Sequence, residues 1–564
     1  MKYLVHSFAF LSIAGAAVGA ACSSSPDPSS SGNLGAGGAG ASMSTSSGSS
    51  QGGGGEGGTV FAGTGGGSAW TGFPVDPVVE EGAPQNAKDL FDAAGAGNPS
   101  GGPCLVEPEP GTLFPRNWLR PRFRFVPAAG QNLFEIRLHI AGEPNDLVVY
   151  TKDPSWTMPA DMWLGLAADV IDKPIDVSIR GGAFDGTSLT DVSVGASGPF
   201  TIAPTEAAGS IVYWTTSGGS ALKGFKVGDE SVIEALAPGQ VQMNTVSDAD
   251  VTCVGCHTST PDGKMVAFTA QGPWGNALAS IEEMSVGAEP SFLGQGARAT
   301  LQQFGETGIS TFSGAHWKPG DRIMVSGLGK FTASQLTWFD LEATGFGEGV
   351  SYGYIKREGD PRGVGAPAWS HDGNTIVYVS TDAQTTGRLD KGYADLFFVP
   401  YANKAGGVAA PMPGASAPAL SEYYPAFSPD DRLLAFNRIP GTDNMYDAPN
   451  AEVFVIPAKG GEPVRIDAND PPACSGKASP GVTNSWPKWA PEAKTVNGKT
   501  YYWLIFSSKR GGAGNPQLYV TGVVAEGDKL TTYPALYLWN QPEAENNHTP
   551  AWDVFDIPPV PPPN

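Results

Sequence analysis

The chain has 564 residues, of which 76 are glycine and 49 are proline, and 10% are aromatic. This length allows more than one folded domain, and the many turn-forming residues favour an all-β protein. The formal net charge of −22, without any cluster of Lys and Arg, argues against nucleic acid as a partner and against direct binding to anionic lipid head groups.

Residues 1–21 have the pattern of a secretory signal peptide, with Lys2 before an apolar stretch and a run of small residues at its end. The run stops at Cys22, and the sequence VGAAC resembles a bacterial lipobox, whose cysteine becomes the lipidated amino terminus after cleavage. The alternative is an ordinary cleaved signal followed by an unmodified cysteine. The Ser/Gly-rich tract after Cys22 favours the lipoprotein, which implies a chain exported to the periplasm or outer membrane of a Gram-negative-type bacterium.

Residues 22–70 are almost wholly Ser, Gly, Ala and Thr, so they cannot bury a core and we expect a disordered tether. About 45 such residues reach roughly 35–40 Å from a membrane surface. No later stretch approaches the ~20 apolar residues of a membrane span, so we expect membrane contact only through the lipid on Cys22. Residues 71–115 are expected to form an extended segment before the first domain.

Residues 116–205 contain short stretches in which apolar and polar residues alternate, such as LFEIRL and IDVSI. This alternation, interrupted by Gly, Pro, Asn and Asp turns, predicts β-strands. About 90 residues with this spacing predict a small immunoglobulin or fibronectin type III-like β-sandwich. No catalytic constellation stands out in this stretch, so we interpret it as a spacer that packs on the next domain.

A second pattern repeats over residues 206–556: an aromatic residue, two turn residues, and then a strand of four or five apolar residues. The first turn residue of each unit stands at position 261, 319, 371, 429 or 491, and each interval is long enough for the four strands of a propeller blade. The motifs PAWSHDG and YPAFSPD resemble those of the TolB-like family of β-propellers. The first unit lacks the P-x-W start and the last lacks Asp-Gly, which leaves the register open at those two units.

The two ends of this region predict how the ring closes. Residues 550–554 begin a repeat that nothing follows, whereas residues 211–236 supply three strands that no repeat start precedes. Together they make a sixth blade, which removes the open seam between first and last blades. The fold prediction is therefore all-β: a six-bladed β-propeller preceded by a small β-sandwich, with a Pro-rich tail over residues 557–564.

Residues 253–257 (CVGCH) carry the C-x-x-C-H pattern of covalent c-type haem attachment. In such a site Cys253 and Cys256 form thioethers to the porphyrin and His257 supplies an iron ligand. His257 occupies the repeat position that holds proline in other units, so we expect the motif at one mouth of the central channel. The alternatives are a disulfide, a thiol redox pair, or half of a zinc site. Zinc is disfavoured because no second Cys/His pair has ligand spacing.

A sixth iron ligand would come from a neighbouring repeat start. His548 precedes the closing strand and His316 precedes the strand on the other side, so both are candidates. Met243 and Met265 are weaker candidates, and we expect His371 in a turn away from the mouth. The sequence contains no G-x-S-x-G elbow, P-loop or dinucleotide fingerprint.

Cys104 and Cys474 are the two cysteines that the lipid and the motif leave over. In an oxidising compartment two such cysteines most simply form a disulfide. This bridge would join the segment before the first domain to a loop of the last repeats.

These observations predict a lipid-anchored TolB-like propeller that binds one covalent haem c and acts in electron transfer or redox sensing in the cell envelope. The alternative is a haem-free scaffold for envelope proteins, with Cys253 and Cys256 joined as a disulfide. A third hypothesis, a peroxidase-like haem enzyme, requires an open iron position. The acidic surface favours a basic protein or a cationic electron carrier as the redox partner.

Overall fold

The structure is a computed structural model that describes residues 70–242, 250–271, 275–304, 308–328, 335–382, 393–443, 445, 447–511 and 514–558. The predicted signal peptide, Cys22 with its lipid, nearly all of the tether, Met243 and most of the Pro-rich tail lie outside this part. Strands make up 43% and helices 9% of the structure, which supports the all-β prediction in coarse outline. None of the described helices is long and apolar enough to cross a membrane.

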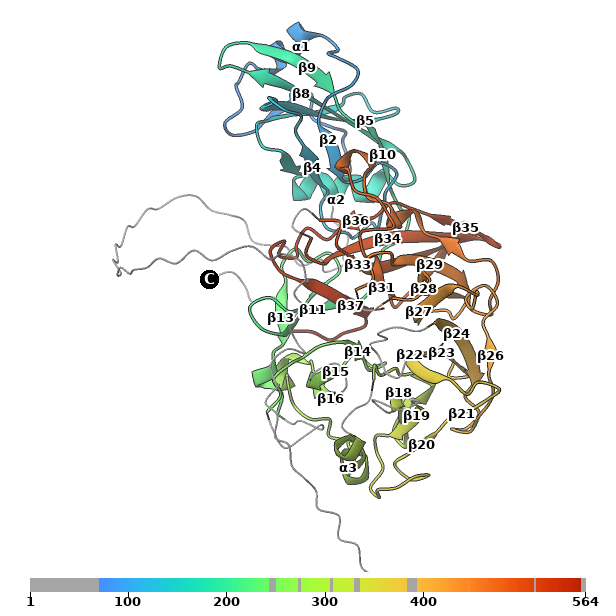
Figure 1. Ribbon diagram of the computed structural model, residues 1–564. Coiled ribbons are helices and arrows are strands. Elements are labelled where there is room, and N and C mark those ends of the chain that lie inside the picture. Colours follow the sequence, from blue (N-terminus) through green and yellow to red (C-terminus); the bar gives the residue numbers. More distant parts are fainter. Residues whose placement is uncertain are drawn as a thin grey trace, which may run out of the picture.

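The amino-terminal unit is built from two sheets, at the top of Figure 1. The larger sheet has the order β1-β6-β5-β8-β10-β3, with β9 also paired to β8, and the smaller has the order β2-β4-β7. The larger sheet contains β1 (Val78–Val79), β3 (Leu113–Phe114), β5 (Leu133–Ile140), β6 (Leu147–Thr151), β8 (Ile175–Phe184), β9 (Leu189–Val194) and β10 (Gly198–Ile202). The smaller contains β2 (Cys104–Glu107), β4 (Arg122–Val126) and β7 (Ser155–Thr157).

The two sheets share a core because each presents apolar side chains at alternate positions. Phe125 of β4 is buried, and its ring centroid lies 4.8 Å from that of Phe134 in β5. Helix α2 (Ala160–Asp169) adds the buried Trp163, whose indole N–H donates to the Trp118 carbonyl at 2.9 Å. These contacts make the unit a packed support for the sheets that follow.

Residues 71–115 differ from the predicted extended segment. They form helix α1 (Ala87–Ala94) and supply strands β1, β2 and β3 to the two sheets. β1 and β3 join β6 and β10 in parallel, so they pair backbone groups at the ends of the larger sheet. β1 and β3 have only two residues each and carry no alternation of their own, which is why the sequence pattern missed them.

Residues 210–553 fold into six consecutive antiparallel sheets, with an additional parallel pair between β21 (Lys356–Glu358) and β25 (Gly406–Val408). Sheets one to three contain β11 (Ser210–Thr215), β12 (Ala221–Lys226) and β13 (Ile233–Leu236); β14 (His257–Ser259), β15 (Met265–Gln271) and β16 (Gly275–Ser280); and β17 (Trp317–Lys318), β18 (Asp321–Leu328), β19 (Gln335–Asp340) and β20 (Tyr352–Tyr354). Sheets four and five contain β22 (Gly363–Trp369), β23 (Thr375–Thr381), β24 (Ala394–Pro400) and β26 (Ala410–Pro411); and β27 (Leu420–Phe427), β28 (Leu433–Pro440), β29 (Glu452–Pro457) and β30 (Val464–Arg465). Sheet six contains β31 (Ser485–Trp489), β32 (Lys494–Val496), β33 (Lys499–Ser508), β34 (Gln517–Glu526), β35 (Lys529–Thr532) and β36 (Leu536–Tyr537), and helix α3 (Gln295–Phe304) precedes the third sheet.

The last strand, β37 (Asn547–Asp553), completes the first sheet by pairing antiparallel with β11. This pairing aligns Asp553 with Ser210 and His548 with Trp214. The strand pairing that the unmatched repeat start predicted is therefore present, and it joins the carboxyl-terminal strand to the beginning of the repeat region.

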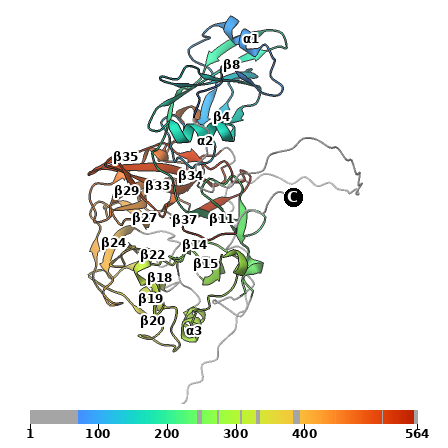
Figure 2. The same ribbon diagram turned by 180° about the vertical axis from the view of Figure 1, so that it is seen from behind.

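The six sheets pack on one another in order. β14 contacts β37, β18 contacts β22, β22 and β24 contact β27, β28 contacts β31, and β31 and β33 contact β37. Between the second and third sheets, Leu278 and Met324 belong to one hydrophobic cluster. Figures 1 and 2 show the first strands of these sheets, among them β14, β22 and β27, together with β37, facing the middle of the arrangement.

A strained backbone position recurs in four of these inner strands. Its φ values are positive, at 31°, 52°, 59° and 45° in Ala366, Tyr424, Trp486 and Thr549. Each of these residues directly precedes a proline, and at each the register shifts so that two residues face one on the neighbouring strand. Positive φ is costly for residues with a side chain, above all for a β-branched one. The repeats therefore share a bulge, and in the second sheet Cys256 stands at the same sequence position.

The third sheet differs from the predicted register. We expected its inner strand at Trp317, but Thr311 pairs with Val325, and Trp317 belongs to the tight hairpin of β17 and β18. The short helix η3 (Gly314–His316) lies between these two pairings. His316 therefore follows the residue that pairs with Val325, and it directly precedes only the short hairpin strand β17.

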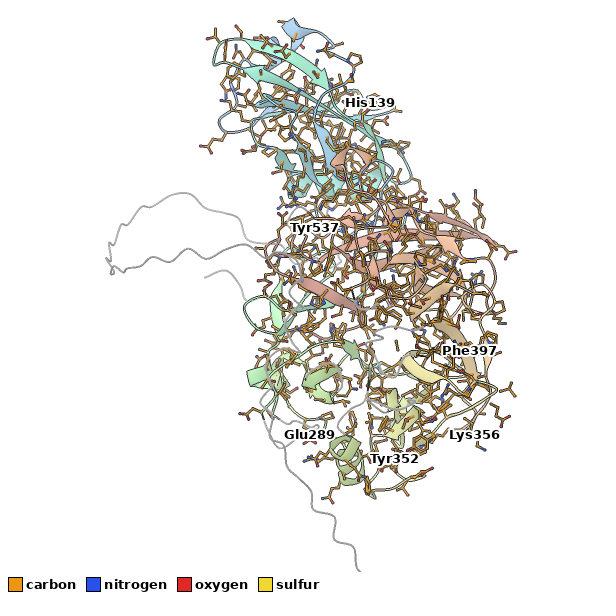
Figure 3. The ribbon with its side chains drawn as sticks, viewed as in Figure 1. His139, Glu289, Tyr352, Lys356, Phe397 and Tyr537 are labelled. Carbon is orange, nitrogen blue, oxygen red and sulfur yellow. A yellow bond between two sulfur atoms is a disulfide. The ribbon has the colours of Figure 1, made fainter. Side chains whose placement is uncertain are left out.

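A dense junction ties the amino-terminal unit to the sheets. Cys104 and Cys474, the pair that the sequence left over, form a disulfide with Cα atoms 5.6 Å apart. Trp118 packs against Trp552 with ring centroids 5.8 Å apart. Tyr537 lies between the two parts of the molecule in Figure 3. These contacts hold the two units against each other.

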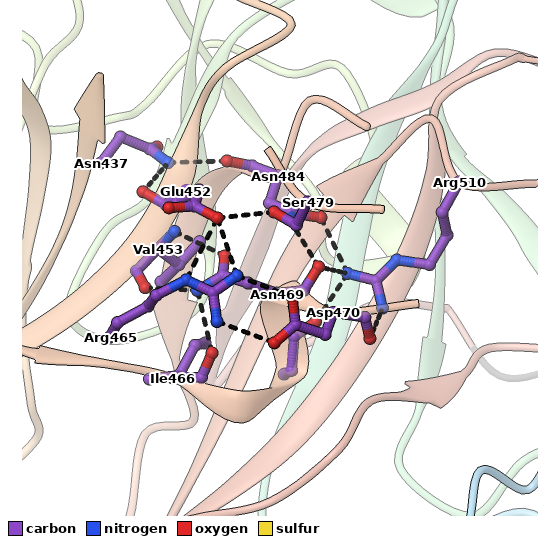
Figure 4. Close-up of polar contacts among 11 residues, drawn as sticks. Asn437, Glu452, Val453, Arg465, Ile466, Asn469, Asp470, Ser479, Asn484 and Arg510 are labelled. Carbon is purple, nitrogen blue, oxygen red and sulfur yellow. Dashed lines mark hydrogen bonds and ion pairs between the residues drawn. The ribbon is translucent and has the colours of Figure 1, made fainter. Parts of the chain in front are cut away.

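A buried network around Arg510 fixes the loop that leads to Cys474 (Figure 4). The guanidinium donates to the carbonyls of Ala468 at 2.6 Å and Asn469 at 3.2 Å. It also donates to Asn484 Oδ1 at 2.8 Å, and Asn484 Nδ2 donates to the Asn469 carbonyl at 2.9 Å. Burial lowers the pKa of Arg510, so these acceptors are what makes an interior guanidinium tolerable.

Candidate functional site

The C-x-x-C-H motif leads directly into β14, the inner strand of the second sheet. The Gly255 N–H donates to the Thr269 carbonyl at 3.0 Å, and the Thr269 N–H donates to the Cys256 carbonyl at 3.0 Å. Two motif residues therefore face one residue of β15, as in the bulges of the other sheets. A Cβ on Gly255 would lie 2.3 Å from Thr269 Oγ1, so any larger residue at this position would force the Thr269 side chain to move.

A serine that the sequence analysis missed holds the first half of the motif. Ser220 Oγ lies 3.5 Å from Cys253 Sγ, accepts from the Val254 N–H at 3.1 Å and donates to the Val254 carbonyl at 2.8 Å. The Trp214 indole N–H donates to the same oxygen at 2.8 Å. Ser220 lies 33 positions before Cys253, so no local pattern connects the two.

Cys256 carries a free thiol, so the predicted alternative of a Cys253–Cys256 disulfide is wrong. Cys253 is disulfide-bonded, but its partner lies outside the described residues. The two sulfurs have different surroundings: Cys253 is buried beside Ser220, whereas Cys256 also packs against the cluster that contains Tyr424 and Trp486. Burial raises the pKa of Cys256 to about 12, so it is a thiol and not a thiolate at neutral pH.

The His257 imidazole is buried and neutral. Its Nε2 lies 3.2 Å from the Val212 carbonyl of β11, so Nε2 carries the hydrogen. Nδ1 is buried and has no hydrogen-bond partner within the described part of the chain. Burial lowers the pKa of His257 to about 4, against an opposing effect of the Val212 and Gly255 backbone. A neutral ring with an unpaired nitrogen has the chemistry of a metal ligand.

A cavity of 510 Å³ opens beside the first cysteine. Ser220, which touches Cys253, and Thr252, which precedes it, both line this cavity. Its polar lining consists of Thr215, Ser217, Ser220, Lys223, Glu234 and Thr252. Its volume is in the range of sites that hold organic ligands and cofactors. None of Cys253, Cys256 and His257 lines this cavity, which reaches the motif only through Ser220 and Thr252.

The structure places the two candidate sixth ligands differently. His548 of β37 is buried against Trp214, with ring centroids 4.6 Å apart. Burial, with the charges of Lys509 and His257, lowers the pKa of His548 to about 3. The second histidine therefore lies in the electrostatic neighbourhood of His257, on the strand that contacts β14.

The His316 side chain contacts residues that do not belong to the motif. Its Nδ1 lies 3.0 Å from Asp321 Oδ2, and its ring stacks on Trp369 at 4.9 Å and meets the edge of Tyr401 at 4.8 Å. These contacts follow from the η3 insertion and do not direct His316 toward the motif. His371 lies in a turn, as expected, with Nδ1 2.7 Å from Asp431 Oδ1.

Lys488 is a further residue that the sequence analysis missed. It lies in β31 and is half-buried. Burial lowers the pKa of its amine, Asp553 and Cys256 oppose that effect, and Lys488 in turn lowers the pKa of His257. The amine therefore lies in the electrostatic neighbourhood of the motif. Its signal in the sequence was a lysine directly after the repeat proline, where other repeats have alanine.

Comparisons with known proteins leave the family open. No family model matches the sequence, and no curated protein is similar to it. Among solved structures, hydrazine synthase of Kuenenia stuttgartiensis is 14% identical with a TM-score of 0.27, over 51% of this chain and 70% of that one. An ancestral GH74 enzyme is 10% identical with a TM-score of 0.33, over 59% of this chain and 39% of that one. Similarity this low carries no argument about fold or function. Within the described residues, no group of three or more His, Cys, Asp and Glu side chains is placed to hold a metal ion.

Proposed function

We propose that the chain is a lipid-anchored TolB-like β-propeller that carries one covalent c-type haem at Cys253, Cys256 and His257. Its role would be electron transfer or redox sensing in the cell envelope. The observation that carries this proposal is the His257 imidazole: it is buried, neutral and unpaired at Nδ1, directly after a free thiol on an inner strand. Exported chains are where such haem attachment is expected, and the signal sequence supports export.

The propeller part of the proposal has its own support. Six antiparallel sheets follow one another in sequence, each packs on the next, and β37 pairs with β11 across the ends of the region. A closed six-bladed ring would account for all three observations. We further propose that the amino-terminal unit is a sandwich of the immunoglobulin or fibronectin type III type that acts as a fixed spacer.

Each residue of the motif would have a distinct role. The two thiols would tether the porphyrin, and His257 would supply the proximal nitrogen. His548 would be the second ligand in preference to His316, because only His548 lies in the neighbourhood of His257. The bound haem would supply one-electron exchange, and burial and the identity of the second ligand would set its potential. Tethering requires Cys253 as a thiol, so its disulfide must be absent when the haem is attached.

A haem-free scaffold for envelope proteins remains the second candidate. One observation favours it: His257 Nε2 already has a backbone partner in the Val212 carbonyl. The partner in either case would be a redox or envelope protein, and the net charge of −22 favours a basic one.

The test is production of the full chain together with cytochrome c maturation machinery. We expect a sharp α-band after reduction with dithionite, and a haem stain that survives denaturation. Cys256→Ser should weaken or abolish the covalent stain, whereas Cys474→Ser, which removes a cysteine at the junction, should retain it. His548→Ala should shift the spectrum and His316→Ala should leave it unchanged.

Mass spectrometry of the peptide around residues 253–257 decides between the two candidates. A porphyrin adduct on this peptide supports the haem protein. An unmodified or disulfide-linked peptide from cells with active maturation machinery contradicts it and leaves the scaffold.

A further inference from the structure

The cavity of 510 Å³ beside Ser220 has no part in the proposed haem site. Its described lining comes from β11, β12 and β13, from the residues next to these strands, and from Thr252. Gly218 and Gly219 form the turn between β11 and β12, and a Cβ on either glycine would meet no atom within 4 Å. The turn therefore supplies no side chain that fills this space, and the first sheet leaves room there for a ligand.

Two charged residues, Lys223 and Glu234, line this cavity from neighbouring strands. They stand directly opposite each other in the antiparallel pairing of β12 with β13, where opposite side chains share one face of the sheet. A lysine and a glutamate in such positions ordinarily pair with each other. Lys223 instead bonds Glu545, with its Nζ 2.8 Å from each carboxylate oxygen. The Glu234 carboxylate makes neither a hydrogen bond nor an ion pair with any described residue.

The cavity and the ion pair in its wall carry a net charge of −1, because one lysine stands against two glutamates. Hydroxyl groups supply further acceptors. Thr215 Oγ1 donates its hydrogen to Glu545 Oε2 at 3.2 Å, so its oxygen can still accept. The Thr252 hydroxyl has no hydrogen-bond partner in the described part of the chain. A carboxylate beside hydroxyl oxygens complements a ligand whose N–H donors carry positive charge.

We propose that this cavity binds a small aliphatic amine in its ammonium form, held by the Glu234 carboxylate and the hydroxyls of Thr215 and Thr252. The volume of 510 Å³ is in the range of sites that hold small organic molecules. The net charge of the whole chain, −22, attracts cations toward its surface. This site does not depend on haem, since no residue of the C-x-x-C-H motif lines it.

The experiment titrates the full chain with 1,4-diaminobutane and, as an uncharged match, with 1,4-butanediol, at constant ionic strength set with sodium chloride. Calorimetry should show one saturable site for the diamine and weaker binding of the diol. Glu234→Gln should weaken diamine binding about tenfold or more, because it removes the charge that the ammonium group meets. Glu526→Gln, at an exposed glutamate of the sixth sheet that does not line the cavity, should leave binding unchanged.

Three outcomes would overturn the proposal: no binding of the diamine, equally tight binding of the diol, or equally tight binding of the diamine by Glu234→Gln. A second measurement locates the bound amine without any substitution. A carbodiimide activates carboxylates, and an amine held beside one forms an amide and releases the activating group as a urea. Peptide mass spectrometry should find the diamine on Glu234 at concentrations that leave Glu526 unmodified. Equal modification of the two glutamates would contradict the site.

Discussion

Around the Arg510 guanidinium, beside the loop that leads to Cys474, buried polar groups have partners, whereas at the innermost strands several do not. Arg510 donates to three carbonyl or amide oxygens within 3.2 Å. The inner strands instead contain the unpaired His257 Nδ1, the unpaired Thr549 hydroxyl and the amine of Lys488. They also contain the four positive-φ residues that precede prolines.

The difference between these regions indicates what each is for. Fully paired interior networks rigidify a structure and specify one packing. Unsatisfied groups and strained backbone lower stability, and they persist where a ligand or a function needs them. The junction thus has the features of a structural connection, and the inner strands those of a binding region. Three predictions test this contrast.

The largest effect should come from Arg510. Arg510→Leu removes the donors of a buried network and leaves the Ala468, Asn469 and Asn484 oxygens without them. We expect the free energy of unfolding to fall by about 3–5 kcal/mol. Chemical denaturation measures the loss. Arg124→Leu removes a half-exposed ion pair with Glu543 and should cost less than about 1 kcal/mol. Similar losses in both variants would show that the Arg510 network contributes no more to stability than a half-exposed ion pair does.

The next effect is a loss of stability in acid that originates at the inner strands. The pKa values of His257 and His548 are about 4 and about 3 in the folded protein, below the ordinary 6.5. Protonation therefore favours the unfolded state, so their contribution is complete above pH 6.5 and is lost as the pH falls toward 4. Shifts of this size correspond to about 3 kcal/mol for His257 and about 5 kcal/mol for His548.

Denaturant titrations at pH 7 and pH 4.5 measure this loss. His548→Gln should reduce the difference between the two pH values. His139→Gln, at an exposed histidine of the amino-terminal unit, should leave the difference unchanged. If both variants lose as much stability between pH 7 and pH 4.5 as the unaltered chain does, the acid sensitivity does not originate at His548.

The smallest effect should be a gain in stability. Ala366→Gly removes the Cβ from a residue with a φ of 31° and should stabilise the protein by about 1 kcal/mol. Ala368→Gly, two residues later in the same strand and outside the positive-φ set, should destabilise it by a similar amount. Thermal unfolding of both variants tests the strain directly. Destabilisation by both substitutions would show that the bulge stores no strain at Ala366.

Local patterns in the sequence predicted the features that depend on neighbouring residues. The alternation of β5 and the repeats of the later sheets correspond to strands, and the unmatched repeat start at Pro550 predicted the pairing of β37 with β11. The leftover cysteines predicted the disulfide between Cys104 and Cys474 because few pairings were available.

Features that depend on distant contacts were missed. The η3 insertion moved His316 away from the motif, although its spacing from Trp317 looked like that of a repeat start. Ser220 reaches Cys253 only because β12 and the motif meet in space. Lys488 was visible as an exception among repeat alanines, but its lack of an ion-pair partner required the positions of Asp553 and its hydrogen bonds.

The closing strand also sets an order of events in time. Ser259, just after the motif, donates a hydrogen bond to Asp553, a residue 294 positions later in the chain. During synthesis from the amino terminus, the motif is made long before β37, which supplies Asp553, His548 and Thr549 around it. The surroundings of Cys256 and His257 are therefore completed only when the end of the chain arrives. Until then β37 cannot cover Cys256 and His257, and in the folded protein this strand lies against β14, which begins at His257.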